Sequence, residues 1–318
     1  MNAVRVRAIG SRVFQIVPTL LLATFLVFGL MQLVAGDPAL LYAGENPTAE
    51  RIEQVRQQFG LDRPFLVQYA SWVGNAFMGD LSVSMMSSEP VLDAILRTLP
   101  HTLLIVTVSL SLSVLIGVPL GVMAATRART PLDTTIMGFS SVGIAVPNFW
   151  LAMLLITGFA LNRQWFPATG AVLFTDDPIS ALYHTLLPSM ALAASGTAEI
   201  ARQTRSALSE VLASQYVRTL RAKGLSTFRI IYLHGLKNIG VTLLTVMGLL
   251  VNRLLGATVV IEAVFAIPGI GSLVVQGAVA KDFPVVQGVV LAMVILVLVI
   301  NLVIDILYTI IDPRTLRQ

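Results

Sequence analysis

The chain has 318 residues, of which 56% are hydrophobic and 12% charged, and its formal net charge is +4. Soluble domains carry about 25% charged residues, so this composition excludes both a soluble globular protein and a disordered chain. The basic balance does not imply a nucleic-acid partner, because helical membrane proteins carry Lys and Arg in the loops that set their orientation.

Long stretches without charge predict an all-α integral membrane protein with six transmembrane helices. A helix needs about 20 apolar residues to cross a bilayer. The first stretch is also longer than the apolar core of a signal peptide, about 7–15 residues, so we expect it to be retained as a span. The predicted spans lie near residues 13–36, 102–126, 134–162, 185–201, 238–265 and 284–306.

The distribution of Lys and Arg predicts that both chain ends lie in the cytoplasm. With this N-in, C-in orientation, the cytoplasmic pieces hold 14 Lys and Arg residues, and the outer pieces hold 6. An excess of Lys and Arg marks the cytoplasmic side of a membrane protein. The longest outer piece is residues 37–101, and the longest cytoplasmic piece is residues 199–237.

The outer segment 37–101 is predicted to be helical. Residues 50–59 are charged with helical spacing, and residues 64–79 place apolar side chains on one wide helical face. The second stretch is too short to span a bilayer comfortably. Two interpretations remain open: a small helical cap packed on the ends of the spans, or a surface that docks an outside partner or covers a cavity.

The cytoplasmic stretch 209–238 is predicted to fold as a helix, a bend and a second helix. Leu212, Tyr216 and Leu220 follow helical spacing and form an apolar face. Gly224 predicts the end of this helix, and Ser226 can cap a second one. Such a basic amphipathic element can lie on anionic lipid, but a sharp bend is more typical of an element that inserts into a groove on a partner protein.

This stretch resembles the EAA loop of bacterial ABC importer permeases, specifically the first-subunit type of the dipeptide, oligopeptide and nickel family. Further matches cover nearly the whole chain in the family's order. They lie at residues 35–39 (AGDPA), 60–69 (GLDRPFLVQY), 79–84 (GDLSVS), 147–151 (PNFWL), 215–225 (QYVRTLRAKGL), 234–238 (HGLKN), 260–265 (VIEAVF), 268–271 (PGIG), 282–287 (DFPVVQ) and 312–314 (DPR).

The resemblance implies a role and a set of partners. Such permeases pair with a second, homologous permease chain to form a pore. One or two cytoplasmic ATPase subunits bind the EAA loops, and an extracytoplasmic substrate-binding protein delivers the cargo. Transport by ATP-driven alternating access across the bacterial inner membrane is the implied activity, with short peptides as the expected cargo. The resemblance assigns ATPase coupling to Tyr216, Val217, Arg218, Ala222, Gly224, Leu225 and His234.

The chain itself is not expected to be an enzyme or to hold a cofactor. None of its three lysines, Lys223, Lys237 and Lys281, follows a glycine, so a phosphate-binding loop of the G-x-x-x-x-G-K-[ST] type is impossible. ATP and Mg²⁺ are therefore expected on the partner subunits. With no cysteine and three scattered histidines, no metal site is predicted.

Arg253 is the unusual charge, because it falls near the middle of the fifth predicted span. An arginine at that depth must face a cavity, pair with another group or reach the interface. We expect it either to line the pore and engage a substrate carboxylate or peptide carbonyl, or to form an interchain salt bridge or packing anchor. Glu262 is expected to make structural hydrogen bonds. Pro119, Pro147 and Pro188 predict kinks or hinges.

The sequence thus predicts four regions: residues 1–36, an N-terminal tail and first span; 37–101, the outer helical segment; 102–311, a five-helix core with the coupling loop 209–238; and 312–318, a cytoplasmic tail. Two alternatives remain. An ion-coupled secondary transporter would need more polar groups in its spans than this chain has. Nickel chelates and glutathione are other cargoes that similar permeases carry.

Overall fold

The computed structural model describes residues 17–30, 38–43, 48–58 and 60–311. Within these ranges the structure is helical, and its one strand-like pairing is an isolated bridge between Val83 and Pro90. The chain forms two compact units, residues 1–99 with 272–299 and residues 100–271 with 300–318. Parts of the predicted first span, at 13–16 and 31–36, and the predicted tail 312–318 lie outside the described residues.

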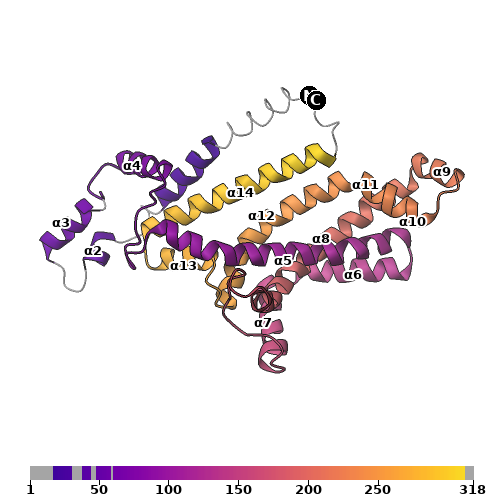
Figure 1. Ribbon diagram of the computed structural model, residues 1–318, viewed down its shortest axis with the longest axis horizontal. Coiled ribbons are helices and arrows are strands. Elements are labelled where there is room, and N and C mark those ends of the chain that lie inside the picture. The colour runs from indigo at the N-terminus through magenta and orange to yellow at the C-terminus, as the bar shows by residue number, and fades with distance from the viewer. Residues whose placement is uncertain (1–16, 31–37, 44–47, 59, 312–318) are drawn as a thin grey trace. The chain divides into compact units, whose positions relative to one another are not determined.

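The first unit contains a short apolar helix and three small helices that follow it. Two long helices, α5 (Val91–Thr126) and α14 (Phe283–Ile311), have residues in both units; Figure 1 labels both. The remaining helices with residues in this unit are Val17–Leu30, α2 (Pro38–Tyr42), α3 (Ala49–Gln58), α4 (Phe65–Phe77) and α13 (Ile270–Val279).

Helix α4 packs through aromatic rings on the helix Val17–Leu30. Phe28 makes edge-on contacts with Phe65 and Tyr69, with ring centroids 5.3 and 5.6 Å apart. The Tyr69 hydroxyl donates a hydrogen bond to the Leu21 carbonyl at 2.8 Å. This part of the predicted apolar face is therefore covered by the helix Val17–Leu30, whereas Phe77 and Met78 at the end of α4 are exposed.

The same unit is held together by the carboxylate of Asp282, which is buried. Ser84 Oγ donates to Asp282 Oδ2 at 2.6 Å, and the Met85 backbone N–H donates to Oδ1 at 3.2 Å. Burial, together with the charge of Asp282, raises the pKa of Tyr42, which donates its hydroxyl proton to the Lys281 carbonyl at 2.8 Å. Two distant sequence motifs, 79–84 and 282–287, thus meet at one hydrogen-bonded carboxylate.

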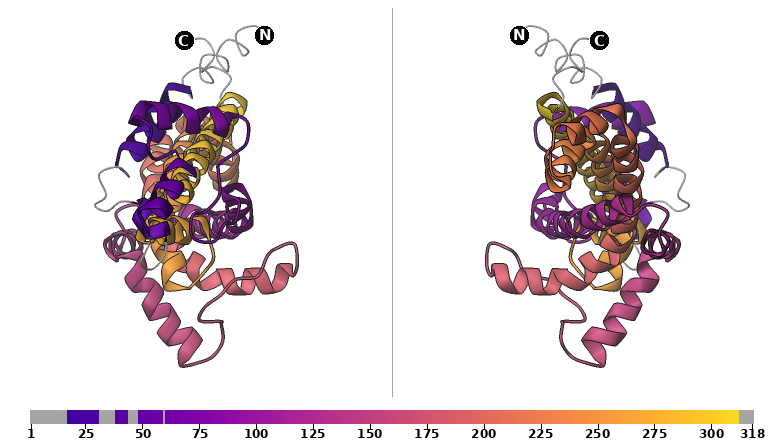
Figure 2. Two further views of the ribbon diagram at one scale, coloured as in Figure 1. Left: turned by 90° about the vertical axis from the view of Figure 1, so that its left-hand side faces the viewer. Right: turned by 90° about the vertical axis from the view of Figure 1, so that its right-hand side faces the viewer.

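The second unit is a helical bundle around the long helix α8 (Pro178–Ala213). Helices α6 (Pro131–Ala145), α7 (Asn148–Leu155) and α12 (Gly240–Val264) each pack on α8. A π-helix, η1 (Ile156–Leu161), continues α7. Figure 1 shows α5, α6 and α8 running alongside one another, and Figure 2 gives the end-on views of the bundle.

Glycines bring α5 against α8. A side chain at Gly117 would place its Cβ 2.8 Å from the Thr197 carbonyl oxygen, and one at Gly121 would lie 2.6 Å from the Ala201 carbonyl oxygen. Small residues at such crossings let helix backbones approach closely, which is how helices gain packing contacts inside a membrane.

Within the described residues the six predicted spans fall mainly on helices, but these helices differ in their capacity to cross a membrane. Among the described residues, three helices are long and apolar enough, Val91–Thr126, Gly240–Val264 and Phe283–Tyr308, and a bent pair of helices makes a fourth. Helix α8, which carries the predicted fourth span, includes Glu199, Arg202 and Arg205, whose charges lower its hydropathy. The helical architecture is therefore confirmed, and within the described residues three or four of the predicted spans are long and apolar enough to cross a membrane.

The third predicted span, 134–162, is not one straight helix. It breaks between α6 and α7, and the two parts are bent by 97°. Pro147 lacks a backbone N–H and disfavours helical geometry in Val146, which is extended with ψ of 124°. Pro119 and Pro188, by contrast, lie inside the unbroken helices α5 and α8.

We expect Gly121→Ala to destabilise the bundle by about 1–3 kcal/mol, because the new methyl group forces α5 away from α8. The matched change Gly138→Ala, in α6, meets nothing within 4 Å. It should be neutral or stabilise by about 0.5–1 kcal/mol, as alanine is the better helix former. Thermal unfolding of the two purified variants in detergent measures the difference, and equal effects would contradict the close α5–α8 crossing.

Candidate functional site

The 209–238 segment folds as two short helical elements joined by a turn. Helix α9 (Gln215–Ala222) is capped by Ser214, whose hydroxyl accepts from the Val217 N–H at 3.5 Å. The chain then turns at Gly224, whose φ of +78° is a conformation that side-chain-bearing residues rarely adopt. Helix α10 (Thr227–Arg229), the π-helix η2 (Ile230–Gly235) and α11 (Leu236–Asn238) follow.

One side of this segment is a small apolar core. Val217 is fully buried and packs with Leu220 and Ile230, and Leu225 lies against the same cluster. Gly235 also packs tightly, because an added Cβ would lie 2.8 Å from the Leu208 side chain of α8. The bend is therefore fixed by packing on the end of α8.

The other side of the segment exposes aromatic and basic side chains. The Tyr216 hydroxyl and His234 Nδ1 share a hydrogen bond of 2.9 Å, and the rings of Phe228 and Tyr232 lie 4.6 Å apart. Phe228 is 69% exposed and Leu233 is 62% exposed. We call Tyr216, Phe228, Tyr232 and Leu233 the aromatic surface. The exposed basic residues around it are Arg218, Arg221, Lys223, Arg229 and Lys237.

The predicted coupling residues divide between these two sides. Tyr216 and His234 are joined on the exposed side, where Arg218 and Ala222 also lie. Val217 belongs to the core, and Leu225, which is half-buried, packs on it. No role was assigned to Phe228 and Tyr232 from the sequence, although their spacing of four residues is a signal that they share one helical face.

We expect Val217→Ala to loosen the 209–238 segment, because it removes two buried methyl groups from its core. The cost should be roughly 1–3 kcal/mol. Arg218→Ala, one residue along on the exposed side, should leave the fold unchanged. Hydrogen exchange of the backbone amides in this segment measures both, and equal protection in the two variants would contradict the packing role of Val217.

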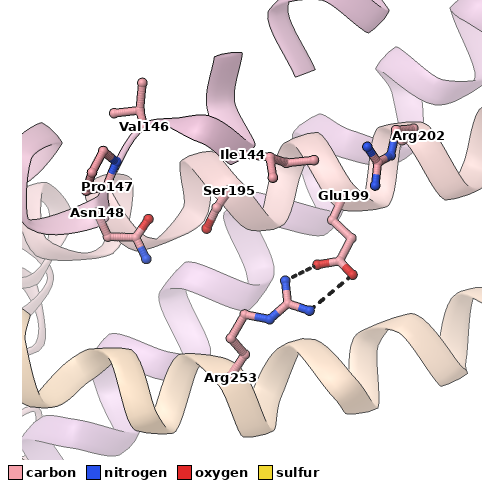
Figure 3. Close-up of a pocket in the computed structure, with 8 residues that line it drawn as sticks. All are labelled: Ile144, Val146, Pro147, Asn148, Ser195, Glu199, Arg202 and Arg253. Carbon is pink, nitrogen blue, oxygen red and sulfur yellow. Dashed lines mark hydrogen bonds and ion pairs between the residues drawn. The ribbon is translucent and has the colours of Figure 1, made fainter. Parts of the chain in front are cut away.

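A second group of polar residues lines a pocket between α8, α12 and the break after α6. Its volume is about 390 Å³, and its lining includes Asn148, Ser195, Glu199, Arg202 and Arg253 (Figure 3). Ser195, Glu199 and Arg202 follow one another at helical spacing along α8. Figure 3 shows the Asn148 amide and the Ser195 hydroxyl directed toward the same space as the carboxylate of Glu199.

Arg253 forms an ion pair with Glu199 across this pocket. Its Nη1 donates to Glu199 Oε2 at 2.5 Å, and its Nη2 donates to Oε1 at 3.4 Å. The Arg253 side chain is 58% exposed and that of Glu199 is 18% exposed. The partner of this arginine is thus in the same chain, and the pair is open to the pocket on the arginine side.

Glu262 lies deep in the same unit and makes structural hydrogen bonds. It is fully buried, and Thr102 Oγ1 donates to its Oε1 at 2.6 Å. Thr102 in turn accepts from the Ile270 N–H at 2.9 Å. A side chain at Gly269 would collide with the Glu262 carboxylate. This carboxylate therefore fixes the 268–271 turn against the start of the bundle.

Comparison with protein families matches both parts of the chain. Residues 117–317 match the family described as "Binding-protein-dependent transport system inner membrane component", and residues 5–106 match its N-terminal counterpart. The first match alone covers more than half of the chain, and it includes the 209–238 segment and the pocket.

Individual relatives align over nearly their whole length. A putative peptide transport system permease protein of Brucella abortus (strain 2308) is 41% identical over 304 residues, covering 96% of this chain and 97% of the relative. The oligopeptide transport system permease protein AppB of Bacillus subtilis (strain 168) is 38% identical over 306 residues, covering 95% and 97%. The glutathione transport system permease protein GsiC of Escherichia coli O6:H1 is 40% identical over 304 residues, covering 95% and 96%.

Among solved structures, an inward-facing conformation of the MetNI methionine ABC transporter has a similar fold. Its TM-score is 0.59 at 22% sequence identity, and the alignment covers 71% of this chain and 99% of that chain. At this identity the likeness concerns the fold alone.

Proposed function

We propose that this chain, which belongs to the family of binding-protein-dependent transport system inner membrane components, carries short peptides through the inner membrane as a pore-forming subunit. The chain is a permease subunit of a binding-protein-dependent ABC transporter, and it is not itself catalytic. This family membership implies ATPase and binding-protein partners.

Short peptides are the cargo that the relatives support best. The names of the aligned relatives specify peptides, oligopeptides and glutathione. Glutathione is itself a tripeptide, so all three descriptions share a small molecule with a free amine and a free carboxylate. A pore that accommodates a charged amine and a charged carboxylate could therefore carry peptides, oligopeptides and glutathione.

The aromatic surface is the observation that carries the coupling part of the proposal. Large exposed aromatic side chains are costly to leave in water and are frequent at the centres of protein interfaces. Here they lie on a bent element that packing on α8 holds in place, with Gly224 at its turn. A cytoplasmic ATPase subunit with an apolar groove and an acidic rim would cover this surface and move α8 and α12 with it.

The coupling residues follow from this assignment. Tyr216, Arg218, Ala222 and His234 would face the ATPase, and Val217, Gly224 and Leu225 would hold the shape of the segment. ATP and Mg²⁺ would bind to the ATPase subunits, one or two of which would dock. This arrangement needs both chain ends in the cytoplasm, as the Lys and Arg distribution predicts.

A second homologous permease would complete the pore. The bundle exposes large apolar side chains on several helices, including Leu115 on α5, Phe139 on α6 and Leu249 on α12. In a membrane such faces are covered by lipid or by other helices. The outer segment 37–101, with exposed Phe77 and Met78, would face the binding protein, and 102–311 would form the permease core.

The test is affinity purification of the tagged chain from its native membrane in mild detergent. We expect a second permease, one or two ATPases and a binding protein to co-purify with the wild-type chain. The double variant Phe228→Ala, Tyr232→Ala should still co-purify with the second permease. The amount of ATPase that co-purifies with it should fall at least about tenfold, because truncating a central aromatic contact typically costs more than 1 kcal/mol of binding free energy.

Phe174→Ala is the matched control. Phe174 is 49% exposed and lies in the loop between η1 and α8, outside the aromatic surface. This variant should bring down as much ATPase as the wild type. Full ATPase recovery with the double variant would remove the aromatic surface from the docking site, and a wild-type chain that purifies alone would contradict the assembly itself.

A further inference from the structure

We infer that the Glu199–Arg253 pocket is a binding site for the two charged ends of a short peptide in transit. Glu199 would accept the terminal ammonium group and Arg253 would bind the terminal carboxylate, each exchanging its partner in the ion pair for the peptide. The inference deepens the proposed function and rests on it, because it assigns a place in the pore to the cargo.

The position of the pair along its helices is the first argument. Arg253 lies near the middle of the 25-residue helix α12, which can cross a membrane by its length and composition. Glu199 lies on α8 at the cytoplasmic end of the predicted fourth span, and its ion pair brings it beside Arg253. Charged side chains at such depth face a bundle interior or a water-filled cavity, and they commonly mark the path of a transported substrate.

The exposure of the pair is the second argument. An ion pair that only anchors two helices is expected to be enclosed by its neighbours. Here the arginine side chain, which lines the pocket, is 58% exposed, whereas the carboxylate is largely covered by protein. The largely covered carboxylate needs a cation beside it, and a peptide ammonium group can take the place of the guanidinium while the peptide carboxylate pairs with the open side of Arg253.

The lining of the pocket supplies the third argument. A zwitterion needs both signs of charge, and Glu199 and Arg253 provide them within one space of about 390 Å³. Pockets for small molecules have volumes of about 300–1,000 Å³. Arg202 adds one positive charge, which favours carboxylates over ammonium groups. The Asn148 amide and the Ser195 hydroxyl are uncharged groups that can bond to a peptide backbone.

The helix break beside the pocket agrees with a water-filled site. Val146 and Pro147, which separate α6 from α7, also line the pocket. Non-helical backbone at membrane depth is tolerated where it is buried in protein or lines a water-filled cavity. The non-helical residues of the broken span therefore line the pocket through which water and a polar cargo would pass.

Substitution of the two charges tests the site in the complete transporter, reconstituted with its ATPases and binding protein. The probes are trialanine, its C-terminal amide and its N-acetyl derivative, and each uptake rate is divided by the wild-type rate for the same peptide. Arg253→Gln should lower trialanine uptake about tenfold, and uptake of the amide by less than about twofold, because the amide lacks the carboxylate that this arginine binds.

Glu199→Gln should give the mirror-image result. It should lower trialanine uptake about tenfold and spare the N-acetyl derivative. Division by the wild-type rate removes the binding protein's own preference among the three peptides. A helix-anchoring role would lower uptake of all three alike, and that outcome would overturn the inference.

A second measurement does not depend on the uptake of capped peptides. The chain contains no cysteine, so Ser195→Cys introduces a single thiol beside the pair. We expect a water-soluble maleimide to modify this thiol in the assembled transporter, and trialanine delivered during ATP turnover to slow the modification at least about threefold. Adding Arg253→Gln should abolish the protection. Labelling is read by mass on this chain alone.

Ser111→Cys is the control for a thiol that faces lipid rather than water. Ser111 is exposed on α5 on the same face as Leu115, an apolar side chain that is 70% exposed, so we expect lipid there and no labelling. An unlabelled Ser195→Cys, or labelling that trialanine does not slow, would overturn the pocket assignment while wild-type uptake of trialanine continues. Absence of wild-type peptide uptake would instead contradict the proposed function, so the two failures are distinguishable.

Discussion

The close approach of α5, α6 and α12 to α8 is the constraint on which the rest of the second unit depends. Lipid tails are as apolar as leucine side chains, so burial alone gives helices in a membrane little reason to associate. Association must therefore come from close packing of the helices, and here glycines allow the backbones to approach. Gly143 of α6 lies against Ala194 and Ala198, and Gly196 of α8 lies between Ser113 and Leu250. Because α8 also carries Glu199 at its middle and α9 at its end, the same packing positions both the pocket and the aromatic surface.

Two buried carboxylates organise the remaining turns in a similar way. Asp282 collects hydrogen bonds from Ser84 and the residues after it, and Glu262 fixes the turn at 268–271 through Thr102. A buried carboxylate is stable only when donors surround it, so each of these residues requires specific neighbours from a distant part of the chain. This requirement explains why short motifs far apart in the sequence occur together.

The sequence was sufficient to predict the helices, the bend at Gly224 and the family, because these follow from apolar runs, glycine and ordered motifs. It predicted kinks at three prolines but could not tell that only the helix at Pro147, among these three, would break. The run 134–162 is uncharged throughout, and two other prolines in similar runs lie inside unbroken helices. Nor could it join Arg253 to Glu199, since a contact across 54 positions depends on how α8 and α12 pack. Phe228 and Tyr232 were passed over because exposed and buried aromatic residues look alike in a sequence.

The π-helix η2 determines where this chain can lose a residue without rotating α12. A π-helix bonds each N–H to the carbonyl five residues back, so it holds one residue more per turn than α geometry would. Ile230–Gly235 carries Tyr232 and Leu233 of the aromatic surface, and only α11 and Ile239 separate it from α12. Loss of a single residue here would let the π-helix relax to an ordinary helix, which absorbs the deletion and keeps Arg253 opposite Glu199. The same deletion inside α12, between Gly240 and Arg253, has no extra residue to absorb it and would rotate Arg253 by about 100°, away from Glu199.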